Sequence, residues 1–238
     1  MSTRGTLRTY TIRVSVNVGW REPVLLPPTQ RPRQADCVPR LPAILPAGPV
    51  TLCRNRVADT ADVVAAVEAS IEDLRPWMDW AADGVPSESA QREAFRRGEA
   101  AFEDGAEFGY VLREVATGEV VGGCGLLPRV GPGGIEMGYW VRSDRHSRGY
   151  ATAAARALTA ASFDWLPEVD RVEIHVDEGN TASAGVPAKL GYRPERREQR
   201  ERVAPGQTGS FVIWVMHRPD WEKGAPARQT RPERDAGG

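Results

Sequence analysis

A polar loop that ends in a glycine separates an apolar run from a long segment with helical spacing. The run is 135–141, Ile-Glu-Met-Gly-Tyr-Trp-Val, and the glycine is Gly149. The first amides of a helix have no partner inside it, and the helix dipole adds partial positive charge there. The amides of residues 147–152 would therefore face an anion, for which a pyrophosphate is the natural candidate. Arg145 and Arg148 could add charge-assisted contacts, although a strand, a loop and a helix with one glycine also occur where nothing binds.

The same loop is similar to the coenzyme A loop of the GNAT superfamily, whose pattern is Gln/Arg-x-x-Gly-x-Gly/Ala. Residues 146–152 read His-Ser-Arg-Gly-Tyr-Ala-Thr, with His146 where glutamine or arginine is usual. Residues 180–192 are similar to the Asn-x-x-Ser…Lys-x-Gly-Phe signature of the ribosomal-protein-alanine (RimJ/RimL-like) branch, and residues 70–81 resemble its substrate-side first helices. The matches follow the family's order over about residues 50–221. On this resemblance the chain is identified as a member of that branch.

The resemblance implies the GNAT fold, a mixed α+β architecture. A central mixed, mostly antiparallel twisted sheet would be flanked by helices and would splay where the coenzyme A strand, 135–141, separates from strand 171–176. The resemblance also implies acetyl-CoA as co-substrate, with its pantetheine arm in that gap and its pyrophosphate on the loop. No metal is expected. The positions that would hold acetyl-CoA are Tyr139, Trp140, Val141, His146, Ser147, Arg148, Gly149, Tyr150, Ala151, Thr152 and Asn180.

The implied activity is direct transfer of an acetyl group to a primary amine in a ternary complex. The acceptor would be a protein N-terminal α-amine or a small-molecule amine, and the sequence does not choose between them. A non-catalytic acyl-CoA-binding module is the first alternative, suggested by His146 and by Pro187, which stands where many GNAT enzymes have a proton-donating tyrosine. Nucleic-acid binding through the arginines is the second, but 31 basic residues are balanced by 32 acidic ones, so the net charge gives it no support.

Two glutamates are candidates for the base that such a reaction would use, because the attacking amine must be neutral. Glu136 lies on the coenzyme A strand, and the alternation of a strand places its carboxylate opposite the apolar Ile135 and Met137. Glu195 falls where RimL-like enzymes have a glutamate with a proposed base role. For either residue the alternative is a solvated or ion-paired carboxylate on a strand.

Ser183 is the candidate acid for the leaving thiolate. The RimL-like branch places a serine with this proposed role at the same position, whereas Pro187 has no proton to give. The alternative role for Ser183, or for Asn180, is to cap the helix that ends at Gly191. His175 is interpreted as a packed histidine rather than a metal ligand, because no second histidine or cysteine lies at ligand spacing.

The periodicity of apolar residues predicts the elements that must position these side chains. Helices are expected at 59–69, 87–103, 149–165 and 182–190, and strands at 107–115, 120–127, 135–141, 171–176, 193–203 and 210–217. Strands and helices in this order imply one mixed sheet with helices packed on its faces.

The ends of the chain differ from the middle in composition. Residues 1–49 are rich in proline and arginine and are predicted to be a disordered extension, residues 50–221 to be the folded domain, and residues 222–238 to be a disordered tail. Three scattered cysteines and the lack of a long apolar run indicate a cytoplasmic protein that does not enter a membrane. The sequence leaves a monomer and a homodimer equally open.

Overall fold

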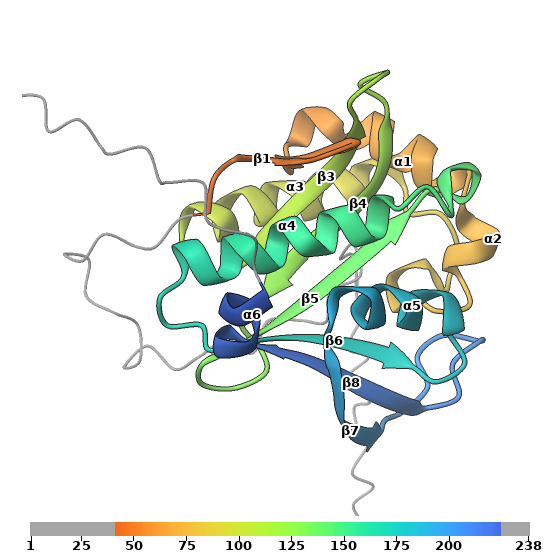
Figure 1. Ribbon diagram of the computed structural model, residues 1–238. Coiled ribbons are helices and arrows are strands. Elements are labelled where there is room, and N and C mark those ends of the chain that lie inside the picture. Colours follow the sequence, from red (N-terminus) through yellow and green to blue (C-terminus); the bar gives the residue numbers. More distant parts are fainter. Residues whose placement is uncertain (1–40, 225–238) are drawn as a thin grey trace, which may run out of the picture.

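The computed structural model describes residues 41–224, and these form one eight-stranded sheet with helices on both faces (Figure 1). The strand order is β1-β2-β3-β4-β5-β6-β8-β7. Every neighbouring pair is antiparallel except β5 and β6, which are parallel. The strands are β1 (Ile44–Ala47), β2 (Val50–Arg54), β3 (Phe108–Glu114), β4 (Val120–Leu127), β5 (Gly134–Val141), β6 (Arg171–Asp177), β7 (Arg193–Gln199) and β8 (Ser210–His217). The mixed, mostly antiparallel sheet expected from the sequence is confirmed.

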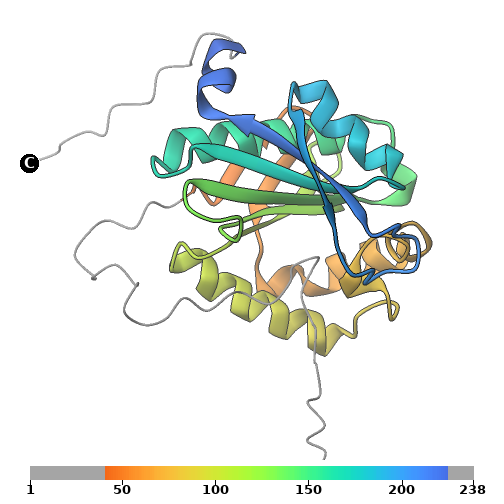
Figure 2. The same ribbon diagram turned by 90° about the horizontal axis from the view of Figure 1, so that it is seen from below.

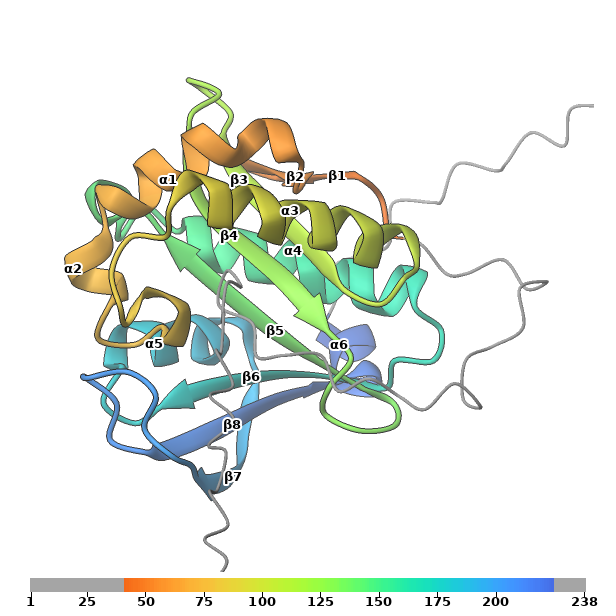
Figure 3. The ribbon, with the colours of Figure 1, turned by 180° about the vertical axis from the view of Figure 1, so that it is seen from behind.

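Two groups of helices cover the sheet. The α-helices are α1 (Thr60–Glu68), α2 (Ile71–Leu74), α3 (Glu88–Glu103), α4 (Tyr150–Trp165), α5 (Thr181–Leu190) and α6 (Arg218–Gly224), and the 3-10 turns are η2 (Val57–Asp59), η3 (Asp79–Ala81) and η4 (Ser143–Arg145). The view in Figure 2 shows α4 and α5 on one face of the sheet and α1 to α3 on the other. Seen from behind, α3 crosses β3 and β4 (Figure 3). No helix among residues 41–224 is both long and apolar enough to cross a membrane.

The alternation of β5 divides its side chains between these two faces. Ile135 and Met137 belong to the core beneath α4, where Ala154 and Ala155 are fully buried and keep the helix close to the sheet. Trp140 belongs instead to the second core, beneath α1 and α3. Glu136 shares the strand face of Trp140, as the period of two residues requires. The sequence prediction of its orientation is confirmed.

The sheet divides between its two parallel strands. Their register runs from Gly134 opposite Arg171 to Glu136 opposite Glu173 and then stops. Beyond this point β5 stays paired with β4 as far as Val141, and β6 stays paired with β8 along its whole length. Each strand therefore keeps its outer partner and loses its inner one, which opens a fork visible in Figure 1. The predicted splay is confirmed, and everything described below is built around it.

The structure differs from the sequence predictions at both edges of the domain. Strand β1 lies inside the range 1–49 that was assigned to the extension, and neither β1 nor β2 was predicted. Pro46 is compatible with β1 because this strand is at the edge of the sheet, where a missing amide hydrogen costs no ladder bond. Helix α6 crosses the boundary predicted at residue 221, and Trp221 packs near Phe163 with ring centroids 6.4 Å apart. The disorder predicted for the two ends falls mainly outside the described residues, as does Cys37.

Candidate functional site

A cleft opens at the fork and contains about 1180 Å³ of empty space, counting its open mouth. Its lining comes from both faces of the sheet. Trp80 reaches it from the α1–α3 side, whereas Asn180 and Ser183 reach it from α5, which packs against α4 on the opposite side. The cleft therefore passes through the sheet where β5 and β6 separate. Two reactants could enter it from opposite faces and meet at the fork.

At the end of β5 the chain forms an open cradle of amide groups. Ser147 and Gly149 adopt the left-handed conformation, with φ of 62° and 79°. Such a conformation strains serine and suits glycine. Within the described part of the chain, the amides of residues 147–152 donate no hydrogen bond, and the first bond of α4 runs from the amide of Ala153 to the carbonyl of Gly149, at 2.9 Å. The unbonded amides predicted for this loop are thus present.

A buried carboxylate fixes the cradle to the rest of the sheet. Glu114 of β3 is 7% exposed and accepts hydrogen bonds from the hydroxyls of Tyr150 and Thr117. Arg145 and Arg148 place guanidinium nitrogens 3.9 and 3.8 Å from this carboxylate. The Tyr150 side chain therefore points into the protein, and only its amide faces the open loop. Hydrogen bonds from Tyr150 and Thr117, with the two arginine charges, hold the pKa of Glu114 below its usual range.

His146, an exposed residue, also supports the loop. Its Nε2 atom lies 3.0 Å from the carbonyl oxygen of Val141, so this nitrogen must carry a hydrogen in order to donate. The side chain thus joins the end of β5 to the start of the cradle. Glutamine or arginine at this position would also present a donor, which explains why histidine is compatible with the loop.

On the other side of the fork, Tyr139 of β5 meets α5. Its hydroxyl donates to the carbonyl oxygen of Ser183 at 3.1 Å and lies 3.3 Å from the Ser183 hydroxyl. Burial raises the pKa of Tyr139 to about 12, so the phenol keeps its proton at neutral pH. The Asn180 side chain accepts from the amide of Ser183 at 3.0 Å, which makes Asn180 the cap of α5. The hydroxyl of Ser183 therefore does not cap the helix, and it lies next to the hydroxyl of Tyr139.

Glu136 lines the cleft as the sequence predicts, but Arg129 engages both of its carboxylate oxygens. The two hydrogen bonds, from Nε and Nη2, measure 2.7 and 2.6 Å. Burial alone would raise the pKa of Glu136, yet the hydrogen bonds from Arg129 hold it below its ordinary value. A carboxylate held in this way is a weak proton acceptor.

The structure does not bring Glu195 to the cleft. This residue lies on the edge strand β7, where the register with β8 is irregular between Pro194 and Arg196. Its carboxylate accepts from Nε2 of His217 at 2.7 Å, and both side chains are about two-fifths exposed. The carboxylate of Glu195 is bonded to His217, and Glu195 is not among the residues that line the cleft. The prediction that Glu195 lies in the site is thus corrected: its carboxylate is partly exposed on a strand and hydrogen-bonded to His217.

A buried polar network on β6 was missed by the sequence reasoning. Glu173 is fully buried and accepts hydrogen bonds from Arg171, Arg196 and His175. His175 and Arg200 both line the cleft. The signal for this network is the alternation Arg-Val-Glu-Ile-His-Val-Asp in β6, which places four polar side chains on one face of a central strand.

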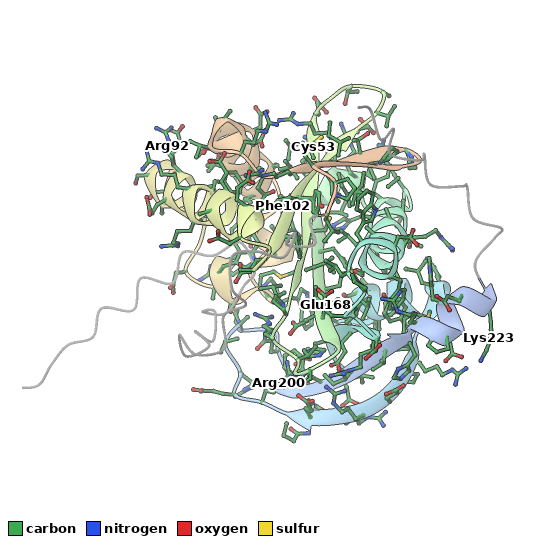
Figure 4. All side chains as sticks on the ribbon, turned by 90° about the vertical axis from the view of Figure 1, so that its left-hand side faces the viewer. Cys53, Arg92, Phe102, Glu168, Arg200 and Lys223 are labelled. Carbon is green, nitrogen blue, oxygen red and sulfur yellow. The ribbon has the colours of Figure 1, made fainter. Side chains whose placement is uncertain are left out.

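Two segments that are distant in sequence close one end of the cleft. The amide of Gly206 donates to the carbonyl of Pro76 at 2.8 Å, and the Gln207 side chain donates to the carbonyl of Trp77 at 3.0 Å. A side chain in place of Gly206 would meet the Pro76 backbone, which requires glycine there. Trp77 and Trp80, for which the sequence left core and cleft wall open, both line the cleft. The β7–β8 connection, which begins at Arg200 (labelled in Figure 4), thus forms a wall together with the segment after α2.

Comparison with known proteins agrees with this geometry. Residues 50–193 match the family described as "Acetyltransferase (GNAT) domain". Among curated proteins the chain is similar to YdaF of Bacillus subtilis, named as a ribosomal N-acetyltransferase, at 31% identity over 87 residues. That alignment covers 37% of this chain and 47% of YdaF, so the chain spans about half the length of this relative.

Solved structures show the same fold. RimJ of Mycobacterium smegmatis, described in complex with a coenzyme A disulfide, aligns with a TM-score of 0.64 at 25% identity over 76% of this chain and 88% of RimJ. RimL, described as the ribosomal L7/L12 α-N-protein acetyltransferase in complex with coenzyme A, aligns with a TM-score of 0.66 at 16% identity over 73% of this chain and 97% of RimL. The predicted resemblance to the RimJ/RimL-like branch is confirmed. The family match covers more than half of the chain, and the chain belongs to the GNAT acetyltransferase family.

Proposed function

We propose that this protein transfers an acetyl group from acetyl-CoA to a primary amine by direct attack within a ternary complex. The observation that carries the proposal is the position of the open amides of residues 147–152 at the end of β5, next to the fork between β5 and β6. A ligand whose anionic group binds these amides could extend a flexible arm into the cleft, along the edge of β5 that no strand covers. Coenzyme A has this form, since its pyrophosphate carries a long arm that ends in a thioester.

The residues proposed to hold acetyl-CoA fall into two groups. The main chain of residues 147–152 would bind the pyrophosphate, with Arg148 half exposed beside it. The main chain of Tyr139, Trp140 and Val141 lies beyond the last pair of β5 with β6 and would bind the pantetheine arm. His146 and Asn180 support these groups from behind, through Val141 and Ser183.

The chemistry proposed for the fork needs one proton donor and one proton acceptor besides correct alignment. Alignment of amine and thioester accounts for roughly 7–11 kcal/mol of barrier reduction in favourable cases. Ser183 remains the candidate acid for the departing thiolate, and its neighbour Tyr139 carries a proton at neutral pH that could follow through the hydroxyl pair. Glu136 remains a candidate for orienting the acceptor amine, because its negative charge lies in the cleft wall.

The acceptor would enter from the side of α1 to α3, where Trp77 and Trp80 form the wall. A protein N-terminal α-amine and a small-molecule amine both fit this proposal, and the named activity of YdaF and RimL favours the former. We place the reaction in the cytoplasm, since the free Cys53 and Cys124 are compatible with a reducing compartment.

The test uses the purified full-length protein. Acetyl-CoA binding is measured by calorimetry, and coenzyme A release is measured with a peptide that begins with alanine and with a set of small primary amines. Binding followed by amine-dependent release supports the proposal. Binding without release above hydrolysis would favour the non-catalytic acyl-CoA-binding module, and the absence of binding at millimolar acetyl-CoA would refute both.

A further inference from the structure

His175 is held at the fork between a buried carboxylate and the open cleft. Its Nε2 lies 2.8 Å from an oxygen of Glu173, and its Nδ1 lies 2.9 Å from a guanidinium nitrogen of Arg200 and 3.5 Å from an oxygen of Glu136. A guanidinium only donates hydrogen bonds, so Nδ1 is the acceptor and the proton of the neutral ring is on Nε2. The lone pair of His175 is therefore directed away from Glu173.

Glu173 is a permanent anion behind this imidazole. Arg171 and Arg196 donate to it, each at 2.7 Å, and its side chain is fully buried. Burial alone would raise the pKa of Glu173, but the hydrogen bonds from Arg196, Arg171 and His175 lower it to about 2. A carboxylate on one ring nitrogen fixes the tautomer and stabilises the imidazolium that forms when the other nitrogen takes a proton. Glu136, by contrast, is committed to Arg129 through both oxygens.

We propose that Nδ1 of His175 accepts the proton of the acceptor's ammonium group, with Glu173 as the residue that positions it. This inference rests on the proposed acetyl transfer. The ammonium gives one proton to Nδ1, the neutral amine forms the C–N bond to the acetyl carbon, and the C–S bond breaks. The second proton of the nitrogen ends on the sulfur of coenzyme A, and the imidazolium returns its proton to water. One ammonium and one thioester thus yield one amide, one thiol and one released proton.

Arg200 occupies the place that the acceptor would take. It donates to Nδ1 as an ammonium would, and its side chain is 23% exposed at the wall of the cleft. Arg200 would keep its other contacts after its hydrogen bond to Nδ1 of His175 is broken. Its guanidinium also donates to Glu198 and lies 5.0 Å above the Phe211 ring. An incoming cation could therefore displace one contact of Arg200 without unfolding the wall.

The charges around His175 favour the neutral ring at physiological pH. Burial lowers its pKa below the ordinary value, and the charge of Arg200 acts in the same direction, whereas Glu136 and Glu173 oppose both. Arg171 and Arg196 are paired with Glu173, and Arg129 is paired with Glu136, so these carboxylates offset the positive charges nearest to His175. A base must be unprotonated before it can act, and His175 meets this condition.

Nitrogen NMR of ¹⁵N-histidine-labelled protein tests the first half of the inference. The chain has three histidines, so the variants His146→Gln, His175→Gln and His217→Gln assign every signal. At pH 7.5 the spectrum should show His175 as the neutral Nε2-protonated tautomer. A ring protonated on Nδ1, or an imidazolium, would overturn the proposal, whether or not the protein turns over.

Kinetics with acetyl-CoA and the alanine peptide tests the second half. In the wild-type protein kcat/KM should form a plateau between the pKa of His175 and that of the peptide amine, about 7.7–8.0. His175→Gln should lower kcat/KM by about 10²–10⁴-fold, and the remaining rate should rise up to the pKa of the amine. Acetyl-CoA affinity should stay near the wild-type value, which shows that the variant is folded, whereas some loss of thermal stability is expected because the His175 side chain is buried and donates to Glu173.

The matched control is His217→Gln, which removes the other histidine–glutamate pair, exposed and outside the cleft. This variant should keep the wild-type rate and pH profile. A His175→Gln variant that acetylates the peptide at the wild-type rate would overturn the assignment while leaving the proposed function intact. A wild-type protein that binds acetyl-CoA but acetylates no amine would instead overturn the proposed function.

Discussion

The hydroxyl groups of Tyr139 and Ser183 lie 3.3 Å apart across the fork, one on β5 and the other on α5. They belong to the two elements that would flank a thioester entering the cleft. Both hydroxyls can donate and accept, so together they form a path for one proton. This pair, rather than Ser183 alone, is the structural candidate for the acid.

Removal of either hydroxyl should therefore slow turnover, and the two losses should not add. We expect Tyr139→Phe and Ser183→Ala each to lower kcat by about 10–100-fold. This loss is at or below the lower end of the usual effect of a proton-transfer group, about 10²–10⁴-fold. The double variant should be little worse than the poorer single variant, because residues that act as a unit are non-additive. Steady-state kinetics with acetyl-CoA affinity as a second readout provides the measurement.

The control for that cycle is the buried pair of Tyr192 and Thr159 of α4, whose hydroxyls are 2.7 Å apart in the core. Tyr192→Phe and Thr159→Val remove a comparable hydrogen bond from the core. They should lower the melting temperature and leave kcat unchanged. Independent, additive losses in the Tyr139 and Ser183 variants would argue against a shared proton path.

The conformation of Gly149 makes its replacement selective for cofactor binding. With φ at 79°, Gly149→Ala strains the backbone at the start of the amide cradle, at a cost of order 1–3 kcal/mol. We expect acetyl-CoA affinity, measured by calorimetry, to fall at least tenfold. Gly48→Ala imposes the same strain at φ 63° in the β1–β2 turn and should lower stability without changing affinity. Equal affinities in the two variants would contradict the role of the cradle.

Glu114 is predicted to act on acetyl-CoA binding from behind the loop. Glu114→Gln removes the charge that faces Arg145 and Arg148 and weakens the acceptor for the Tyr150 hydroxyl. The cradle should become less ordered, and the dissociation constant for acetyl-CoA should rise several-fold while kcat at saturation changes little. A variant with unchanged affinity but reduced kcat would show that Glu114 acts elsewhere.

The low pKa of Glu173 links folding stability to pH. Because the pKa of Glu173 falls from its ordinary value of about 4.3 in the unfolded chain to about 2 in the folded one, the ionised group stabilises the fold at neutral pH. This contribution is present above pH 4.3 and is lost as the pH falls toward 2. Urea unfolding between pH 7 and pH 3 should show a steeper loss in the wild type than in Glu173→Gln. Identical slopes would mean that Glu173 is not paired as described.

The parts of this site that the sequence predicts are those encoded locally. The loop before Gly149 and the strand that carries Glu136 each depend on spacing within a dozen residues, and the structure has both as expected; of the two residues left open as caps of α5, Asn180 is the one observed. Pro46 illustrates the opposite case: its local signal excludes a strand, but an edge position removes the objection. Local sequence patterns predict the conformation of a segment but not which strands lie beside it.

The errors arise where distant strands decide the outcome. Glu195 stands three residues after Tyr192, where the resemblance implies a base, but β7 pairs irregularly with β8 there and the Glu195 carboxylate is bonded to His217. The alternation in β6 predicts that His175 and Glu173 lie on the same face. The tautomer of His175 and the charge of Glu173, however, depend on Arg200 and Arg196, which lie beyond the neighbouring strand β8. Only the assembled sheet shows which carboxylate is held by arginines and which ring nitrogen is available.

The bridge between Gly206 and Pro76 has a consequence for how new acceptors could arise in this family. Most of the proposed donor side, the end of β5 and the loop before α4, is one continuous stretch of sequence, whereas the wall proposed to face the acceptor is shared by two surface connections, the one after α2 and the one before β8. Substitutions or insertions in those connections would reshape the entrance for the amine and leave the thioester anchored. Because the two parts can change separately, the same fold could come to accept a different amine while the residues around the thioester stay the same.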